Sequence, residues 1–331
     1  MDTGNTKVLI IQTASIGDVI LSTALAESLN ALQPAPEIHV VVKQGMQGLF
    51  EGHPFIRKVW VWDKRSRKYL QLLRLIVGIR KEGYDRVVNV QRFFSSGLLT
   101  LLSGARQRSG FSKNPLSFGF TRRVVHEIGN GMHETERNYR LLEDFKGAPF
   151  RRPALYPGPD EMEAVRAYLK EPFITVAPAS LWYTKQFPPD RWVEFLHNVP
   201  SELHILLLGG PPDTPLCRQI MKELPELRIT DLSGRLGLLE SAALMKHARM
   251  NYVNDSAPLH LASAVNAPVR AIFCSTVPDF GFGPLSDDGK VVETEVALEC
   301  RPCGLHGLER CPEGHFRCAN TIDLNKLWTE L

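Results

Sequence analysis

Three polar stretches of this sequence each follow an apolar run typical of a β-strand, and each holds side chains suited to chemistry. The first, residues 13–18, comes directly after the apolar run 7–12. In an open α/β sheet, the turn from such a strand into a helix lies at the carboxyl edge, where ligands bind. Gly17 permits close approach of the backbone, and Asp18 would stand in the first helical turn. The alternative is that Ser15 or Asp18 only caps the helix.

The second stretch is residues 254–260, Asn-Asp-Ser-Ala-Pro-Leu-His. Asp255 and Ser256 can cap a helix whose free N–H groups and dipole would bind phosphate. His260 lies one turn further on the same face as Ser256 and could donate to a phosphate oxygen. The alternative is a helix cap followed by a core histidine.

The third stretch, residues 179–188, contains Lys185 and follows the apolar run 173–177. A lysine at the carboxyl end of a strand can neutralise a leaving diphosphate. An ordinary surface lysine would look the same, so this stretch is weak by itself. The chain has no G-x-G-x-x-G after its first strand, so dinucleotide-dependent hydride transfer loses its main support.

The elements that must position these residues alternate between strand and helix. In the first half we expect strands at residues 7–12, 38–42, 58–61 and 86–90, with helices at 17–32, 66–82 and 93–102. In the second half we expect strands at residues 173–177, 204–208, 228–230, 250–253 and 269–273, with helices near 190–198, 212–224, 238–248 and 258–264. This alternation predicts parallel sheets covered on both faces.

Residues 146–160 contain four prolines and two glycines and interrupt the alternation of strands and helices. They are therefore the best linker candidate. We therefore predict an α/β protein of two Rossmann-like domains, residues 1–150 and 151–331. That is the GT-B architecture, in which both sheets face a central cleft that holds the site. The pattern alone leaves a single large α/β enzyme open. The start of the chain resembles neither a signal peptide nor a membrane span, which predicts a cytoplasmic protein with reduced cysteines.

Charge is unevenly spread along the chain. Residues 1–150 carry 21 Lys and Arg against 13 Asp and Glu, whereas residues 151–331 carry 18 against 23. A basic half points to an anionic partner, such as phosphate, a membrane surface or nucleic acid, or it is only a solvated face. No RNA or DNA motif is present and the aromatic residues form no stacking platform, so we expect no nucleic-acid partner.

Taken together, the three stretches resemble glycosyltransferase family 9, the ADP-heptose:lipopolysaccharide heptosyltransferase family, in their order and spacing. The resemblance covers nearly the whole chain, including residues 85–91 and the cysteine-rich end. Two positions depart from the family: Ala257 stands where glycine is common, and Asn89 stands where many relatives have aspartate.

The resemblance implies a role for each motif. Asp18 is the expected catalytic base. The expected donor-binding residues are Ser180, Lys185, Asp255, Ser256, Ala257 and His260. The implied reaction is inverting transfer of a heptose, or a related sugar, from an ADP-sugar to an anionic lipopolysaccharide core or lipid A-type acceptor, with no cofactor required. Two alternatives are heptosyl transfer to an adhesin-like protein and, less favoured, a nucleic-acid-binding protein.

The acceptor is expected on the basic half. Arginine pairs with two oxygens of a phosphate or carboxylate at once. We expect several of the candidate arginines to lie in loops after strands of the first sheet. The candidates are Arg92, Arg106, Arg108, Arg122 and Arg123.

Four cysteines crowd into residues 300–318 with the spacing C-x2-C-x7-C-x6-C: Cys300, Cys303, Cys311 and Cys318. Four such ligands suit zinc or iron, and some relatives carry iron on a similar segment. The alternative is a set of reduced, buried or redox-linked thiols. We expect any metal to be structural, because the phosphate motifs lie elsewhere in the sequence.

Residues 64–81 contain seven Lys or Arg, with Tyr69, Leu72, Leu73 and Ile76 at helical spacing. One interpretation is a helix that holds the protein on the cytoplasmic face of the inner membrane. The favoured alternative is an amphipathic helix that packs on the sheet with its polar face in water.

Overall fold

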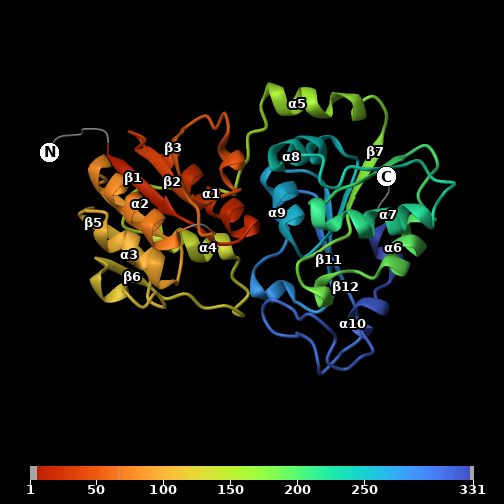
Figure 1. Cartoon of the computed structure of the whole chain (residues 1–331). Coiled ribbons are helices and arrows are strands. Elements are labelled where there is room, and N and C mark those ends of the chain that lie inside the picture. The colour runs from red at the N-terminus through yellow and green to blue at the C-terminus, as the bar shows by residue number, and fades with distance from the viewer. Residues whose placement is uncertain (1–5, 66, 329–331) are drawn as a thin grey trace. The chain divides into compact units, whose positions relative to one another are not determined.

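The computed structural model describes residues 6–65 and 67–328. The chain forms two compact units, Met1–Tyr156 and Pro157–Leu331, which are described one at a time. Each unit contains one six-stranded parallel sheet with helices packed on it (Figure 1).

The first unit is built on a sheet with the strand order β3-β2-β1-β4-β5-β6. Its strands are β1 (Lys7–Ile11), β2 (Glu37–Lys43), β3 (Ile56–Trp62), β4 (Arg86–Asn89), β5 (Gln107–Phe111) and β6 (Arg122–Val124). Its helices are α1 (Ile16–Asn30), α2 (Lys68–Glu82), α3 (Phe94–Leu102) and α4 (Glu134–Tyr139), with short 3-10 turns η1 (Gln47–Phe50), η2 (Ser117–Gly119) and η3 (Arg140–Leu142). Right-handed crossovers place α1 on one face of this sheet and α2 and α3 on the other.

The second unit repeats that strand order, β12-β11-β10-β7-β8-β9. Its strands are β7 (Phe173–Ala177), β8 (His204–Leu207), β9 (Ile229–Asp231), β10 (Asn251–Asn254), β11 (Val269–Phe273) and β12 (Gly289–Glu293). Its helices are α5 (Pro159–Val165), α6 (Pro189–Leu196), α7 (Thr214–Lys222), α8 (Leu238–His247), α9 (Ala257–Ala264) and α10 (Arg317–Asn320). Its 3-10 turns are η4 (Arg166–Tyr168), η5 (Tyr183–Lys185), η6 (Pro211–Asp213), η7 (Pro278–Phe280) and η8 (Leu324–Leu327).

Apolar packing on the sheets explains why these elements form. In the first unit, one face of α2 (Leu72, Leu75, Ile76 and Ile79) packs with Leu9, Val41 and Val87 of the strands. In the second unit, Trp192 and Phe195 of α6 are fully buried beside Tyr252 of β10. Burying side chains of this size is the main favourable contribution to folding.

Three strands of the structure were not among those predicted, β5, β6 and β12. The residues of β5 and β6 are Gln-Arg-Ser-Gly-Phe and Arg-Arg-Val, which lack the continuous apolar run used to find the other strands. The predicted helix 66–82 begins at Lys68 in the structure, and Ser66 lies outside the described residues.

Along the chain, the boundary between the units falls between Tyr156 and Pro157. It lies inside the proline-rich segment 146–160, six residues after the predicted boundary. Residues 151–156 belong with the first unit because they bind α1. The backbone N–H groups of Arg151 and Ala154 donate to the Ser28 and Thr23 hydroxyls at 3.2 and 3.1 Å. The Tyr156 hydroxyl donates to Glu27 at 2.8 Å.

Candidate active site

In each sheet, the order in which the chain adds strands reverses at one point. This switch point lies between β1 and β4 in the first unit and between β7 and β10 in the second. In open α/β sheets, ligands bind at the carboxyl ends of the strands beside such a switch point. Residues 13–18 and 90–92 come after β1 and β4. Residues 178–188 and 255–260 come after β7 and β10. The three predicted stretches therefore lie at the two switch points.

Asp18 forms a capping box with Ser15 at the start of α1. Its Oδ2 atom accepts from the Ser15 hydroxyl at 2.6 Å and from the Ser15 N–H at 3.2 Å. The Asp18 N–H in turn donates to Ser15 Oγ at 3.4 Å. The Oδ1 atom of Asp18 has no hydrogen-bond partner among the described residues. The carboxylate thus caps the helix with one oxygen and keeps the other available.

Lys64 is a residue that the sequence analysis placed only in a basic helix. It lies just after β3, and its Nζ donates to the carbonyl and the hydroxyl of Thr13 at 2.8 and 3.0 Å. Burial, together with Lys43 and Lys68, lowers the pKa of Lys64 to about 8. The Thr13 hydroxyl donates to the Gln91 side chain at 2.7 Å. The rule that located Asp18, a polar residue just after a strand, also fits Lys64.

Asn89 is fully buried at the end of β4. Its Oδ1 accepts from the Gln91 N–H at 2.9 Å, so the residue shapes the turn after the strand. The side-chain amide nitrogens of Asn89 and Gln91 are buried and have no hydrogen-bond partner among the described residues. Buried donors without partners are uncommon in folded proteins, and these two lie beside the first switch point.

The prediction that several of the candidate arginines lie in loops after strands is wrong, because only Arg92 of the five does so. Arg106 precedes β5 and Arg108 is its second residue, whereas Arg122 and Arg123 begin β6. The start of a parallel strand lies at the opposite edge from its carboxyl end. The strands were missed because they are polar, so their first residues were interpreted as loops.

Two of these arginines already have partners within the first unit. The Arg108 guanidinium donates to the carbonyls of Ala105 and Gly119 at 2.7 and 3.3 Å. Arg122 forms an ion pair with Glu143. Arg92 is exposed and lies three residues after β4, at the carboxyl edge.

Lys185 and Asp255 come together at the second switch point. The Lys185 Nζ lies 2.7 Å from Asp255 Oδ2, and both side chains are largely buried, with 16% and 8% exposed. The Thr276 hydroxyl donates to the same oxygen at 2.6 Å. One oxygen of the carboxylate is therefore engaged by both a cation and a hydroxyl, and it fixes the position of the lysine.

Asn254 ties the lysine loop to β10. Its Oδ1 accepts from the Phe187 N–H at 2.9 Å, and its Nδ2 donates to the Pro178 carbonyl at 2.7 Å. Asn254 is fully buried. One amide thus holds both ends of the loop that carries Ser180 and Lys185.

Ser256 is the N-cap residue of α9, but its side chain does not cap the helix. Its hydroxyl instead contacts the Asn254 carbonyl at 3.4 Å, and Asp255 is engaged with Lys185 and Thr276. The prediction that these side chains cap the helix is thus wrong. Pro258 has no N–H and the Leu259 N–H donates to the Ser256 carbonyl at 3.1 Å, so among the described residues the Ala257 N–H is the donor that the start of α9 keeps for an anion. His260 is buried one turn further along.

The cysteine-rich segment packs against the loops of the second switch point. The Thr184 N–H donates to the Leu308 carbonyl at 3.1 Å, and the Leu308 N–H donates to the Thr184 hydroxyl oxygen at 2.8 Å. The Arg301 guanidinium donates to the carbonyls of Cys274 and Thr276, both at 2.7 Å. The segment is distant from residues 179–188 in the sequence but adjoins them in the fold.

The four cysteines of this segment are free thiols. Burial, and then the neighbouring Cys303 and Cys311, raises the pKa of Cys318 to about 11. Among the described residues, no three of the cysteines bring their sulfurs within 4.8 Å of one another. The thiols thus suit a metal chemically, but they do not form a preassembled site.

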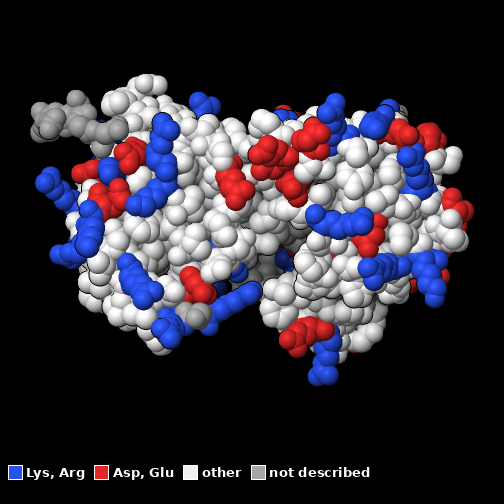
Figure 2. Space-filling model, turned by 45° about the horizontal axis from the view of Figure 1, so that its top comes forward, with Lys and Arg blue, Asp and Glu red and all other residues white. Residues whose placement is uncertain are grey.

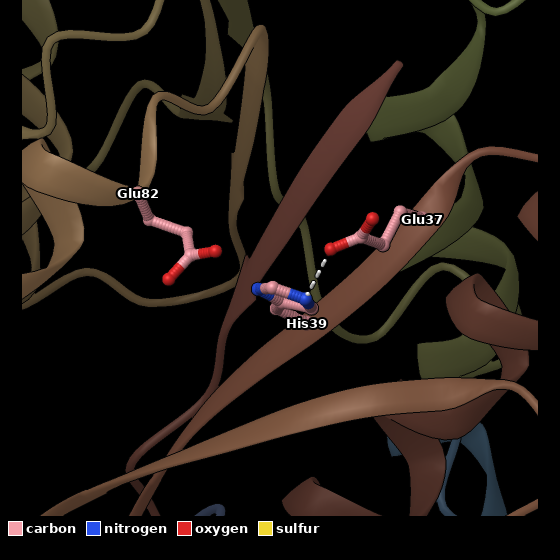
Figure 3. Close-up of side chains that lie close together, drawn as sticks. All are labelled: Glu37, His39 and Glu82. Carbon is pink, nitrogen blue, oxygen red and sulfur yellow. Dashed lines mark ion pairs between the residues drawn. The ribbon is translucent and has the colours of Figure 1, made fainter. Parts of the chain in front are cut away.

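In the described parts of the chain, the one group of three potential metal ligands within 4.8 Å is Glu37, His39 and Glu82 (Figure 3). It lies near the amino end of β2, away from the switch-point edge. His39 Nε2 contacts Glu37 at 2.9 Å, and Lys7 Nζ lies 3.6 Å from Glu37 and 3.0 Å from Glu82. Lysine already neutralises both carboxylates, so this group is a structural ion-pair network.

No helix within the described residues is long and apolar enough to cross a membrane. Helix α2 packs one apolar face on the sheet, which agrees with the packing part of the favoured alternative for residues 64–81. Its other face is considered below.

Comparison with known proteins places the chain in a family. A sequence model of glycosyltransferase family 9 (heptosyltransferase) matches residues 72–306, well over half of the chain. Lipopolysaccharide heptosyltransferase 1 of Campylobacter coli is 24% identical over 315 residues, which cover 87% of this chain and 89% of that protein.

Solved structures share the fold. A family 9 glycosyltransferase from Veillonella parvula matches with a TM-score of 0.85 at 20% identity, covering 99% of this chain and 96% of that one. The ADP-heptose lipopolysaccharide heptosyltransferase II of E. coli matches with a TM-score of 0.77 at 20% identity, covering 95% and 98%. The chain therefore belongs to glycosyltransferase family 9, and it is a glycosyltransferase of the GT-B fold class.

Proposed function

We propose that this enzyme transfers a heptose, or a closely related sugar, from an ADP-sugar to an anionic lipopolysaccharide core acceptor. The observation that carries the proposal is the buried Lys185–Asp255 pair beside an uncapped helix start at the second switch point. The relative from C. coli and the structure from E. coli both carry the name lipopolysaccharide heptosyltransferase, and the latter names ADP-heptose.

On the donor side, the diphosphate would lie between Lys185 and the first turn of α9. The lysine and the Ala257 backbone N–H would stabilise the charge that grows on the leaving group. Ser180, Ser256 and His260 would add hydrogen bonds. Asp255 would contribute through Lys185, because a carboxylate in direct contact with phosphate would repel it.

On the acceptor side, the Oδ1 atom of Asp18 would take the proton from the acceptor hydroxyl. The hydroxyl oxygen would then bond to the anomeric carbon from the face opposite the diphosphate, and the bond from that carbon to the diphosphate oxygen would break. These steps invert the configuration at the anomeric carbon and need no cofactor. Arg92 and Lys64, both near the carboxyl edge of the first sheet, would hold the anionic groups of the acceptor.

The reaction would take place in the cytoplasm, where nucleotide sugars are made, at a membrane that carries the lipid-borne acceptor. A donor screen tests the proposal. Calorimetry with ADP-heptose and with UDP-, GDP- and CMP-sugars should show binding of the ADP-sugar with clear preference. Equal or better binding of another nucleotide sugar would overturn the donor assignment.

The cysteine-rich segment carries a separate proposal, a structural zinc or iron ion. It is supported by four thiols on one segment whose thiolates would repel one another unless a cation were bound. Elemental analysis of anaerobically prepared protein should find about one equivalent of metal per chain. Metal-free, fully active protein would overturn it and leave the transferase proposal untouched.

A further inference from the structure

Helix α2 has two apolar faces. Leu72, Leu75, Ile76 and Ile79 are buried against the sheet. On the outer side, Tyr69, Leu73 and Val77 stand at four-residue intervals and are 76%, 57% and 52% exposed. An ordinary amphipathic helix would present polar residues there. The outer apolar stripe is therefore not explained by packing within the first unit.

The charges around this stripe all have one sign. Arg74, Arg80 and Lys81 are exposed on α2. The sole acidic residue of the helix is Glu82, and it forms ion pairs with Lys7 and Lys58 at 3.0 and 2.6 Å. The outer face of α2 is thus apolar and basic, with no acidic side chain of its own.

The same side of the sheet offers further apolar side chains. Helix α3 lies beside α2 (Figure 1), and Phe93 and Phe94 at its start are 53% and 59% exposed. Residues 64–106 contain ten Lys or Arg and two acidic residues. On the face of the first unit drawn in Figure 2, Lys and Arg side chains lie among uncharged ones, and Asp and Glu side chains lie there as well.

We infer that the outer face of α2, defined by Tyr69, Leu73, Val77, Arg74, Arg80 and Lys81, docks on the surface of an anionic lipid bilayer. A helix of this kind lies in the plane of the interface, with apolar side chains among the acyl chains and lysine and arginine at the headgroups. Nucleic acid fits less well, because Leu73 and Val77 cannot stack on bases. The purpose of the docking, access to a lipid-borne acceptor, rests on the proposed function.

Vesicle co-sedimentation tests the surface directly. Wild-type protein should bind phosphatidylethanolamine vesicles that contain about 30 mol% phosphatidylglycerol, and binding should weaken with added salt. The variant Arg74→Gln, Arg80→Gln and Lys81→Gln should bind about 100-fold more weakly, at roughly fivefold for each charge near the surface. The variant Tyr69→Ser, Leu73→Ser and Val77→Ser should lose about tenfold or more.

A matched control removes the same charge from the second unit. The variant Lys170→Gln, Lys222→Gln and Lys246→Gln should bind vesicles like the wild type, because these exposed lysines lie outside the α2 surface. If this control lost as much binding as the α2 variants, overall charge would explain the affinity and the inference would fail. Wild-type binding to RNA but not to vesicles would also overturn it.

A second readout separates this inference from the proposed function. The α2 variants should transfer sugar to a water-soluble, delipidated core acceptor at the wild-type rate. Vesicle binding without any transferase activity would leave the docking surface standing and refute the proposed reaction. Transfer of the sugar without vesicle binding would support the proposed reaction and refute the docking surface.

Discussion

The two oxygens of the Asp18 carboxylate have different surroundings, and that difference makes the proposed base testable. Replacement by asparagine keeps an oxygen that can cap α1 but removes the ability to accept a proton. We expect Asp18→Asn to lower the transfer rate by about 10²–10⁴, the usual cost of losing a general base. Donor affinity, measured by calorimetry, should stay within a few fold of the wild type.

Ser15→Ala provides the matched control for Asp18→Asn. It removes the hydroxyl that bonds to Asp18 Oδ2 but leaves the carboxylate in place. The variant should lose about 1 kcal/mol of stability, as is typical for an N-cap, and keep most of its activity. Near-normal turnover of Asp18→Asn would show that the carboxylate is a helix cap and nothing more.

The negative charge of Asp255 could either weaken or strengthen donor binding. If its charge only opposed the diphosphate, Asp255→Asn would tighten donor binding. Because Asp255 instead holds Lys185 at 2.7 Å, we expect the variant to weaken ADP-sugar binding by about tenfold or more. Calorimetry on Asp255→Asn, Lys185→Met and the double variant measures this.

The double variant supplies the control. If the two residues act as one unit, the double variant should bind hardly more weakly than Lys185→Met alone. Fully additive losses would show that Asp255 contacts the donor independently. Unchanged affinity in both single variants would mean that the phosphate site has been misplaced.

At the scale of elements, the cysteine-rich segment supports the donor loops. Arg301 ties this segment to the carbonyls of Cys274 and Thr276, and the Thr276 hydroxyl holds Asp255. We expect Arg301→Gln to raise the donor dissociation constant several-fold, with Arg301→Lys partly restoring it. The physical reason is that Lys185 loses the fixed partner that orients it.

An exposed ion pair of the same region serves as the comparison. Lys326→Gln removes a contact with Glu295, which is largely exposed, so it should change neither donor affinity nor stability appreciably. A fall in melting temperature of Arg301→Gln with unchanged donor affinity would show that the segment only stabilises the fold.

At the scale of the whole molecule, the first unit should lose stability in mild acid. Burial lowers the pKa of His53 from 6.5 to about 4. As the pH falls below 6.5, His53 binds a proton in the unfolded chain but stays neutral in the folded chain. The free energy of unfolding therefore declines as the pH falls to about 4. Burial also lowers the pKa of His39, which acts in the same direction.

Urea unfolding between pH 7.5 and pH 5 checks this, with pH values chosen around the ordinary histidine pKa of about 6.5. His53→Asn keeps an acceptor for the Ile56 N–H but cannot titrate, so its stability should depend less on pH than that of the wild type. An identical pH dependence in His53→Asn and the wild type would contradict the assignment.

The sequence by itself determined where the strands with continuous apolar runs lie, and it located Asp18, Lys185 and Asp255 just after three of them. It did so because a parallel strand buried on both faces must be apolar throughout, and because ligands bind where such strands end. The same rule missed β5 and β6, because these strands contain polar residues. As a result, four arginines in or beside these strands were assigned to loops.

Only the tertiary structure decided which residues meet. The pairing of Lys185 with Asp255 and Thr276, the contact of Lys64 with Thr13, and the packing of residues 301–308 on the donor loops all join distant parts of the sequence. It also showed that α2 has a second apolar face, because helical spacing could not tell which of its apolar residues pack on the sheet. Such pairings depend on strand order and side-chain packing, which no local pattern of residues encodes.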